Sequence, residues 1–249
     1  MKRYEFILGH ISAACISIQE DLDRQLLWIA CRHHVGEIIL TWVWNGLKIE
    51  ISKSPEITLF QRFRDQYDSL SHGDLTNLNF LHVEDELQDD KTKCIQLIKK
   101  VLSDKTFAYR GDYTVFLKVT LVLLTGDLTN FKIPRPGAVH KARWMMKGII
   151  SQVMYLMMPK IQSELPKNSI LTAKQADDLK RFVKFICLVY VPWWVTCPLP
   201  ADSPINDLTL LKTIRKYPDT VISTEAEKAM LNHCWYLTEE LVPLALFSP

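Results

Sequence analysis

The sequence predicts a mainly α-helical protein with a minor β component. Apolar residues recur at helical spacing along most of the 249 residues, and only 8 glycines are present to form the tight turns of an all-β fold. Two short apolar segments, residues 26–31 and 47–51, have the length expected of strands. An open parallel sheet would need many more strands between its helices, so a doubly wound α/β fold is disfavoured.

In the first part of the chain, capping residues place the expected helices. Residues 13–25 form a short helix with an acidic exposed side, and a second helix over residues 33–46 finds its natural stop at Gly46. Ser54 as the N-cap and Pro55 in the first turn begin a third helix, which runs to about residue 70.

Two helices are expected in the middle of the chain. Residues 83–102 begin with acids, which the positive end of the helix dipole favours, and then become apolar. Residues 112–124 are apolar enough for a buried helix, which Gly126 ends. A further helix over residues 137–158 is followed by a predicted linker at residues 159–168.

Prolines divide the last part of the chain. Residues 172–191 are expected to form a helix that cannot continue through Pro192, because proline lacks the amide N–H that a helix needs. Residues 207–216 and 224–246 are the last expected helices, and Pro243 bends or shortens the final one.

The composition is that of an ordinary globular protein, with 23% charged residues and a net charge of +2. Such a charge does not by itself indicate a nucleic-acid partner. Six cysteines are widely scattered, which favours a reduced, intracellular protein over a disulfide scaffold. The longest apolar runs fall short of the ~20 residues that a membrane-spanning helix needs, so no membrane association is expected.

A locally basic segment stands out against this neutral background. Between residues 132 and 147 there are five cations and no acid: Lys132, Arg135, Lys141, Arg143 and Lys147. On a helix, His140, Arg143, Trp144 and Lys147 share one face, opposite an apolar stripe that is suited to a core. Cations around one aromatic ring fit a phosphate backbone and an unstacked base. The alternative is a solvated basic face with one half-buried tryptophan.

The Cys-x-x-His spacing of Cys31 and His34 is a candidate metal site at a strand-to-helix junction. Glu37 follows one helical turn later, and thiolate, imidazole and carboxylate are all good zinc ligands. A structural zinc site needs four ligands, and no second matching pair is present. A buried cysteine with histidines at a helix start is the alternative.

Glu239 and Glu240 differ from the other acidic pairs because aromatic and apolar residues flank them. An acid in such surroundings can bind a metal ion, whereas a surface acid beside a core stripe is the alternative reading. A complete metal-dependent hydrolase would require Glu37 and one of these two glutamates to lie close to a common metal position.

Several of these segments together resemble a known family. The predicted strand followed by Cys31, His34 and an apolar helix resembles the Cys-x-x-His–Leu-x-Leu element of hAT-type transposases. Arg143 and Trp144, preceded by Ala142, resemble their Thr-Arg-Trp segment. The wider pattern, including LLWIACRHH, PGAVHKARWM, FICLVYVPWW and NHCWYLTEELVPLALF, resembles transposon-derived proteins of animal genomes.

The resemblance implies the remnant of an RNase H-like core with a large helical insertion. Residues 1–50 would be the partial core, residues 51–130 the insertion, and residues 131–249 a helical part that carries the basic helix. In such transposases an Asp-Asp-Glu triad holds two Mg or Mn ions for phosphoryl transfer. The first two aspartates would lie upstream of this sequence, leaving Glu239 or Glu240 as the third acid. No cofactor and no strand-transfer activity are therefore expected.

The function expected from this resemblance is that of a truncated or domesticated transposase-like protein. It would be catalytically inactive, would retain DNA binding and would be nuclear. The alternative is a helical protein-interaction module, with a protein partner or a second copy of the chain, and without a nucleic-acid role. Four tryptophans are the aromatic surface candidates of that alternative: Trp42, Trp44, Trp193 and Trp194.

Overall fold

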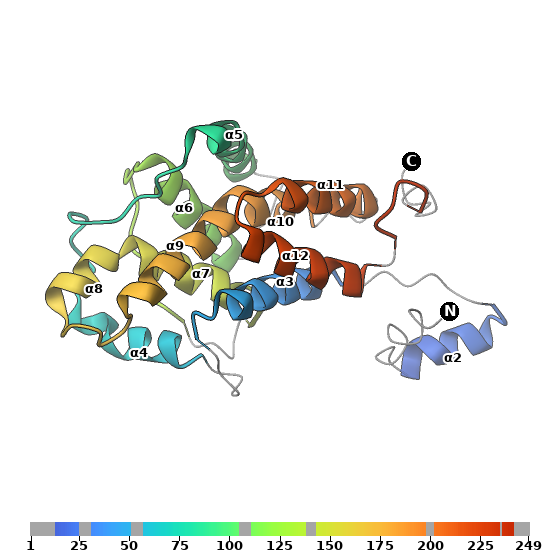
Figure 1. Cartoon of the computed structure of the whole chain (residues 1–249), viewed down its shortest axis with the longest axis horizontal. Helices are drawn as coiled ribbons and strands as arrows, with labels where there is room; N and C mark the ends of the chain where they lie inside the picture. Colours follow the sequence, from blue (N-terminus) through green and yellow to red (C-terminus); the bar gives the residue numbers. More distant parts are fainter. Residues whose placement is uncertain are drawn as a thin grey trace.

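The computed structural model describes residues 13–24, 31–50, 57–104, 111–137, 143–197, 202–234 and 236–241. Every regular element in these ranges is helical (Figure 1), which confirms the mainly α prediction. The α-helices are α2 (Ala13–Asp21), α3 (Arg32–Leu47), α4 (Thr58–Gln66), α5 (Gln88–Ser103), α6 (Gly111–Thr125), α7 (Arg143–Leu156), α8 (Met158–Glu164), α9 (Ala173–Phe185), α10 (Val191–Trp194), α11 (Ser203–Lys216) and α12 (Thr220–His233). The short turn η1 (Tyr67–Ser69) follows α4 directly, and η2 (Asp85–Leu87) leads directly into α5. The turn η4 (Ile186–Tyr190) joins α9 to α10.

The predicted strand at residues 47–51 does not form in the part that the structure describes. Leu47 is the last residue of α3, and Lys48 follows it in the left-handed conformation, with φ 56° and ψ 34°, that commonly ends a helix. The other predicted strand, residues 26–31, lies outside the described residues except for Cys31.

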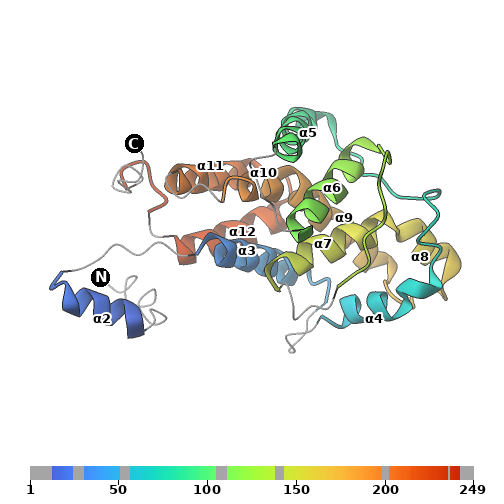
Figure 2. The ribbon, with the colours of Figure 1, turned by 180° about the vertical axis from the view of Figure 1, so that it is seen from behind.

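Helices α3, α7 and α9 pack against one another, and α12 lies along α3 in both views (Figures 1 and 2). Gly46 permits this close packing, because an added Cβ would lie 2.5 Å from Cγ of Glu225 on α12. One hydrophobic cluster joins buried residues from all three predicted segments of the chain, and the division into 1–50, 51–130 and 131–249 stays a prediction. Helix α2 lies apart from this bundle (Figure 2).

The helical path does not stop before Pro192, as the sequence predicted, but continues through α10 to Trp194. The reason is the π-helical turn η4, in which the N–H of Val191 donates to the carbonyl of Ile186, five residues earlier. With this spacing, the carbonyl of Cys187 would need the N–H of residue 192, which proline lacks. The Sγ–H of Cys94 on α5 donates to that carbonyl instead, at 3.0 Å.

Two further boundaries differ from the prediction. Residues 159–168 do not form a simple linker, because α8 covers Met158–Glu164 with Pro159 in its first turn, where the missing N–H costs nothing. The last helix, predicted over residues 224–246, starts earlier at Thr220 and ends at His233. After it the chain leaves the helical path, and the hydroxyl of Tyr236 donates to Asp207 on α11 at 2.6 Å.

Asp207 is the centre of a buried polar network that ties together four parts of the bundle. Arg32, at the start of α3, donates from both terminal nitrogens to its carboxylate, at 2.6 and 2.5 Å. The indole N–H of Trp193 donates at 2.7 Å, and Tyr236 completes the set. Burial raises the pKa of Asp207, and the Arg32 guanidinium opposes this shift. Four donors on one carboxylate explain how a charge can stay inside this core.

Among the described helices, none is both long enough and apolar enough to cross a lipid bilayer.

Candidate nucleic-acid interface

The sequence-predicted basic segment is divided between surface and core. Lys132 and Arg135 are exposed in the extended stretch between α6 and α7. The guanidinium of Arg135 forms an ion pair with Asp68, with 2.6 Å between Nη2 and Oδ2. Lys132 forms no ion pair with any residue that the structure describes.

Lys147 on α7 is not a freely exposed cation. Its side chain is half-buried, and this burial lowers the pKa of its ammonium group, while the nearby carboxylate of Glu37 on α3 acts in the opposite direction. The predicted apolar stripe of this helix is confirmed by buried Met146, Ile149 and Val153. Almost every described side chain from residue 146 to 158 is buried, so α7 is a central helix of the bundle.

The remaining members of the predicted basic face cannot be placed. His140 and Lys141 lie outside the described residues, as do the side chains of Arg143 and Trp144. Their common face therefore stays a prediction, and the two described surface cations nearest to it are Lys132 and Arg135.

A second group of cations, which the sequence analysis missed, lies on α5 and α6. Lys93, Lys99 and Lys100 are exposed on α5, and Lys118 is exposed on α6. Lys91, also on α5, is half-buried. None of the five forms an ion pair with a described residue. We call Lys93, Lys99, Lys100 and Lys118 the α5–α6 lysine surface.

Helical spacing relates some of these lysines to one another. Lys93 and Lys100 are seven residues apart on α5, which places them on the same side of the helix and about 10 Å apart along its axis. Helix α6, which carries the exposed Lys118, packs against α5. The acids of α5 lie in its first turn, where Asp89 and Asp90 favour the positive end of the helix dipole.

The candidate metal ligands do not form a cluster in the described part of the chain. Cys31 and His34 are both exposed at the start of α3, so Cys31 is not the buried cysteine of the alternative reading. No three His, Cys, Asp or Glu side chains converge around a common point within the described ranges. A metal site at this helix start stays a prediction.

Glu239 and Glu240 are exposed in the segment after α12. The carboxylate of Glu239 pairs with Lys212, with 2.5 Å between Oε1 and Nζ. Backbone hydrogen bonding, helped by Thr238, lowers the pKa of Glu240. This geometry is that of surface acids, and neither glutamate joins Glu37 in a described group that could hold a metal ion.

The prediction that four tryptophans form an aromatic surface of an interaction module is wrong for three of them. Trp44, Trp193 and Trp194 are buried, and Trp42 is half-buried. Trp44 packs between Phe60 and Phe182, with ring centroids 5.0 and 5.3 Å away. These rings are core residues of the bundle.

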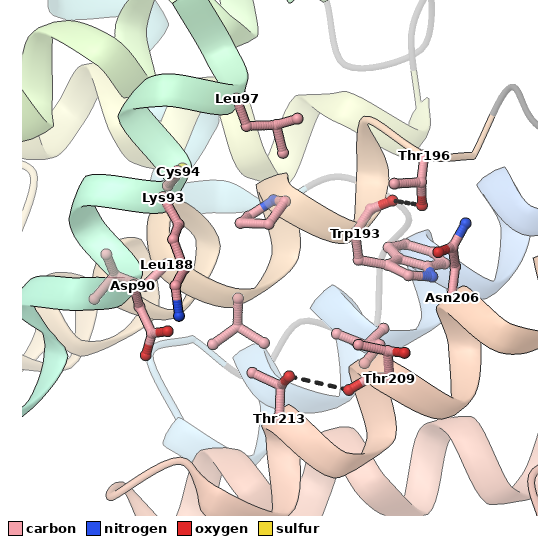
Figure 3. A pocket seen from close by; sticks show the side chains of 13 residues that line it. Asp90, Lys93, Cys94, Leu97, Leu188, Trp193, Thr196, Asn206, Thr209 and Thr213 are labelled. Atoms are coloured by element: carbon pink, nitrogen blue, oxygen red, sulfur yellow. Dashed lines mark hydrogen bonds between the residues drawn. The ribbon is translucent and has the colours of Figure 1, made fainter.

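A small groove lies where α5, α10 and α11 approach each other (Figure 3), with a volume of about 220 Å³. Leu97, Leu188 and Leu210 contribute to its apolar lining. The hydroxyls of Thr196 and Thr213 donate to carbonyls of their own helical segments, as the dashed lines in Figure 3 show. The groove is consequently more apolar than its residue types alone indicate.

Comparisons of this chain with protein-family models, curated protein sequences and solved structures find no match. The likeness to hAT-type transposases therefore remains a prediction from the sequence.

Proposed function

We propose that this chain is a nucleic-acid-binding protein, a transposase-derived DNA-binding protein by the resemblance of its sequence, that acts in the nucleus. The α5–α6 lysine surface carries the proposal, because its cations have no described ion-pair partner. Phosphates provide the negative charge that such a surface lacks, and each contacted phosphate releases counterions from the nucleic acid. Lys132 and the segment that contains Arg143 and Trp144 would extend the same function.

Contacts of this kind fix a protein on the phosphate backbone and do not read sequence. The proposal therefore predicts binding with strong salt dependence and weak sequence preference. An exposed lysine contributes mainly a point charge, so replacing it by glutamine removes the contact and leaves the helix intact.

The test is the affinity for a labelled DNA duplex across a salt series. We expect a triple variant, Lys93→Gln, Lys99→Gln and Lys100→Gln, to reduce the magnitude of the slope of log K against log salt by about 2 to 3. The matched control is Lys212→Gln, Arg215→Gln and Lys228→Gln, which removes the same charge from side chains already held in ion pairs. An equal loss in both triple variants would contradict a specific role for the α5–α6 lysine surface.

The groove of Figure 3 favours a second candidate function, a protein-interaction module that holds one apolar side chain of a partner. Thr209→Arg would fill the groove from α11. Peptides would be selected from a displayed library for binding to the unmodified chain. If the groove is the binding site, these peptides should not bind the Thr209→Arg variant.

A further inference from the structure

Among the Phe, Tyr and Trp side chains that the structure describes, only Phe80 counts as exposed, with 39% of the residue accessible. A single exposed apolar residue needs no explanation by itself. The position of Phe80, near Gly126 at the end of α6, makes it informative.

The backbone on both sides of Phe80 is anchored to helix ends. The N–H of Asn79 donates to the carbonyl of Leu156 at the end of α7, at 2.8 Å, and the N–H of Leu81 donates to Leu123 of α6, also at 2.8 Å. Carbonyls in the last turn of a helix have no partner within that helix, so these two bonds satisfy them. Phe80 is thereby held between two fixed neighbours.

The Phe80 ring lies near Gly126, just after the end of α6. A Cβ added to Gly126 would be 3.9 Å from the ring, which is ordinary contact distance. Gly126 has φ +72°, a conformation that glycine adopts without strain. A side chain at position 126 would therefore touch the Phe80 ring, whereas glycine leaves Phe80 exposed.

Two lysines that form no ion pair with a described residue belong to the same part of the chain. Lys99 is close enough to Asp127, the residue after Gly126, to lower the pKa of its carboxyl, although hydrogen bonding to Thr129 is the larger cause. The N–H of Phe131 donates to the carbonyl of Leu128 at 3.0 Å, and this turn folds the chain back. Lys132 consequently lies within about 11 Å of Leu128 by Cα positions.

We propose that Phe80 stacks on an unpaired base of a single-stranded nucleic acid, while Lys99 and Lys132 bind the flanking phosphates. The inference rests on the proposed nucleic-acid binding and adds the form of the ligand. An aromatic ring held among cations combines the two contacts that single strands offer, a base face and a charged backbone. A duplex offers the backbone only, since its bases are stacked on one another.

Asp127, the residue after Gly126, is an acid close to Lys99, and its charge opposes phosphate binding. Its carboxylate accepts a hydrogen bond from the N–H of Thr129 at 2.9 Å. We expect Asp127→Asn to strengthen single-strand binding and to keep this turn, because asparagine supports the same hydrogen bond.

The experiment uses the full chain and a 16-nucleotide oligothymidine that carries one 2-aminopurine, whose fluorescence falls when it stacks. We expect Phe80→Ala to weaken single-strand binding by about 5- to 100-fold and to abolish the quenching. We expect Phe80→Trp to keep the single-strand affinity and the quenching of the unmodified chain. We expect the affinity for a duplex to be unchanged in both variants. Ile205→Ala on α11, an exposed apolar residue far along the chain, is the matched control. A ribose oligouridine of equal length shows whether the single strand is DNA or RNA.

Each failure has a distinct meaning. Unchanged single-strand affinity and quenching in Phe80→Ala, with duplex binding intact, would overturn the stacking site and leave the proposed function. An equal loss for single strand and duplex, together with a lower melting temperature, would make Phe80 a structural residue. No binding of either nucleic acid by the unmodified chain at low salt would remove the inference and the proposed function together.

Discussion

On α9, α11 and α12, six of the eight Lys and Arg side chains are held in ion pairs, whereas on α5 and α6 none of the five lysines pairs with a described residue. The paired set consists of Lys174, Arg181, Lys184, Lys212, Arg215 and Lys228. Both regions are helical and solvent-facing, so the difference lies in the placement of acids. The cations of the first region have acids within reach on their own or a neighbouring element, whereas the acids of α5 and α6 lie in the first turns of those helices.

The difference teaches how one residue type can serve two purposes. Paired cations such as Arg181 join elements, because its guanidinium bridges Asp178 on its own helix and Asp219 at the start of α12. Lysines without acids repel one another and add little to folding, so their charge stays available to an anionic partner. The following predictions test this contrast, first in the core, where charge pairing has its largest effect.

The largest expected effect comes from Asp207→Ala, which leaves the buried guanidinium of Arg32 without its counterion. Arg32 is 10% exposed and Asp207 is 2% exposed by side chain, so water cannot replace the lost carboxylate. Removing one partner of a buried pair costs about 3–5 kcal/mol of the free energy of unfolding. Urea denaturation, followed by circular dichroism, measures this loss.

Asp202→Ala is the matched control, because Asp202 precedes the same helix, is exposed and makes no capping hydrogen bond. We expect this change to alter the free energy of unfolding by no more than about 0.5 kcal/mol. A loss below about 1 kcal/mol for Asp207→Ala would show that the network around Arg32 is not what holds α3, α10 and α11 together.

We expect the charge of Asp219 to have an intermediate effect, on how the free energy of unfolding depends on pH. Burial alone would raise its pKa, but hydrogen bonds and charge attraction from Arg181, together with the first N–H groups of α12, lower it overall. A lowered folded-state pKa gives stability that is present above the unfolded value, near pH 4, and is lost as the pH falls through the folded value. Asp219→Asn keeps the N-cap but removes the charge, so its stability should fall less steeply below pH 4.

Asp207 supplies the opposite sign as an internal check. Its raised pKa means that the folded state takes up a proton before the unfolded chain does, so this group adds stability as the pH falls. Denaturation midpoints between pH 2 and 6 measure both effects. A profile for Asp219→Asn that is as steep as that of the unmodified chain would show that other carboxylates carry the acid sensitivity.

Most helices could be predicted from local signals. The stop at Gly126 and the acidic first turn of α5 depend on residues within one helical turn, and both were correct. The errors arose where distant contacts decide. Pro192 is accommodated by a π-helical turn, and the thiol of Cys94 donates to the Cys187 carbonyl, which has no partner within the helix; Tyr236 leaves the helical path to reach Asp207. Neither contact leaves a periodic pattern in the sequence.

The candidate site was predictable only in part, for a similar reason. The density of cations near Lys132 is visible in the sequence, but the burial of Lys147 depends on α3 packing against α7. The lysines of α5 are also visible, as KTKCIQLIKK, yet the acids before them make the segment look balanced. Only the structure shows that these lysines form no ion pair with a described acid, and only the structure places Phe80 next to Gly126.

The smallest expected effect is the difference in stability between the two triple glutamine variants, which tests the comparison of the two surfaces directly. Replacing Lys212, Arg215 and Lys228 breaks exposed ion pairs and should cost about 0.5 kcal/mol for each pair at low salt. The triple variant of the α5–α6 lysine surface loses no described ion pair and relieves repulsion, so its stability should be unchanged or slightly higher. Urea denaturation at low salt and at about 1 M salt checks this, because salt screens both terms and should remove the difference between the variants. If the α5 variant were the less stable of the two at low salt, its lysines would be part of the fold's own charge balance, and the contrast between the two surfaces would no longer support nucleic-acid binding.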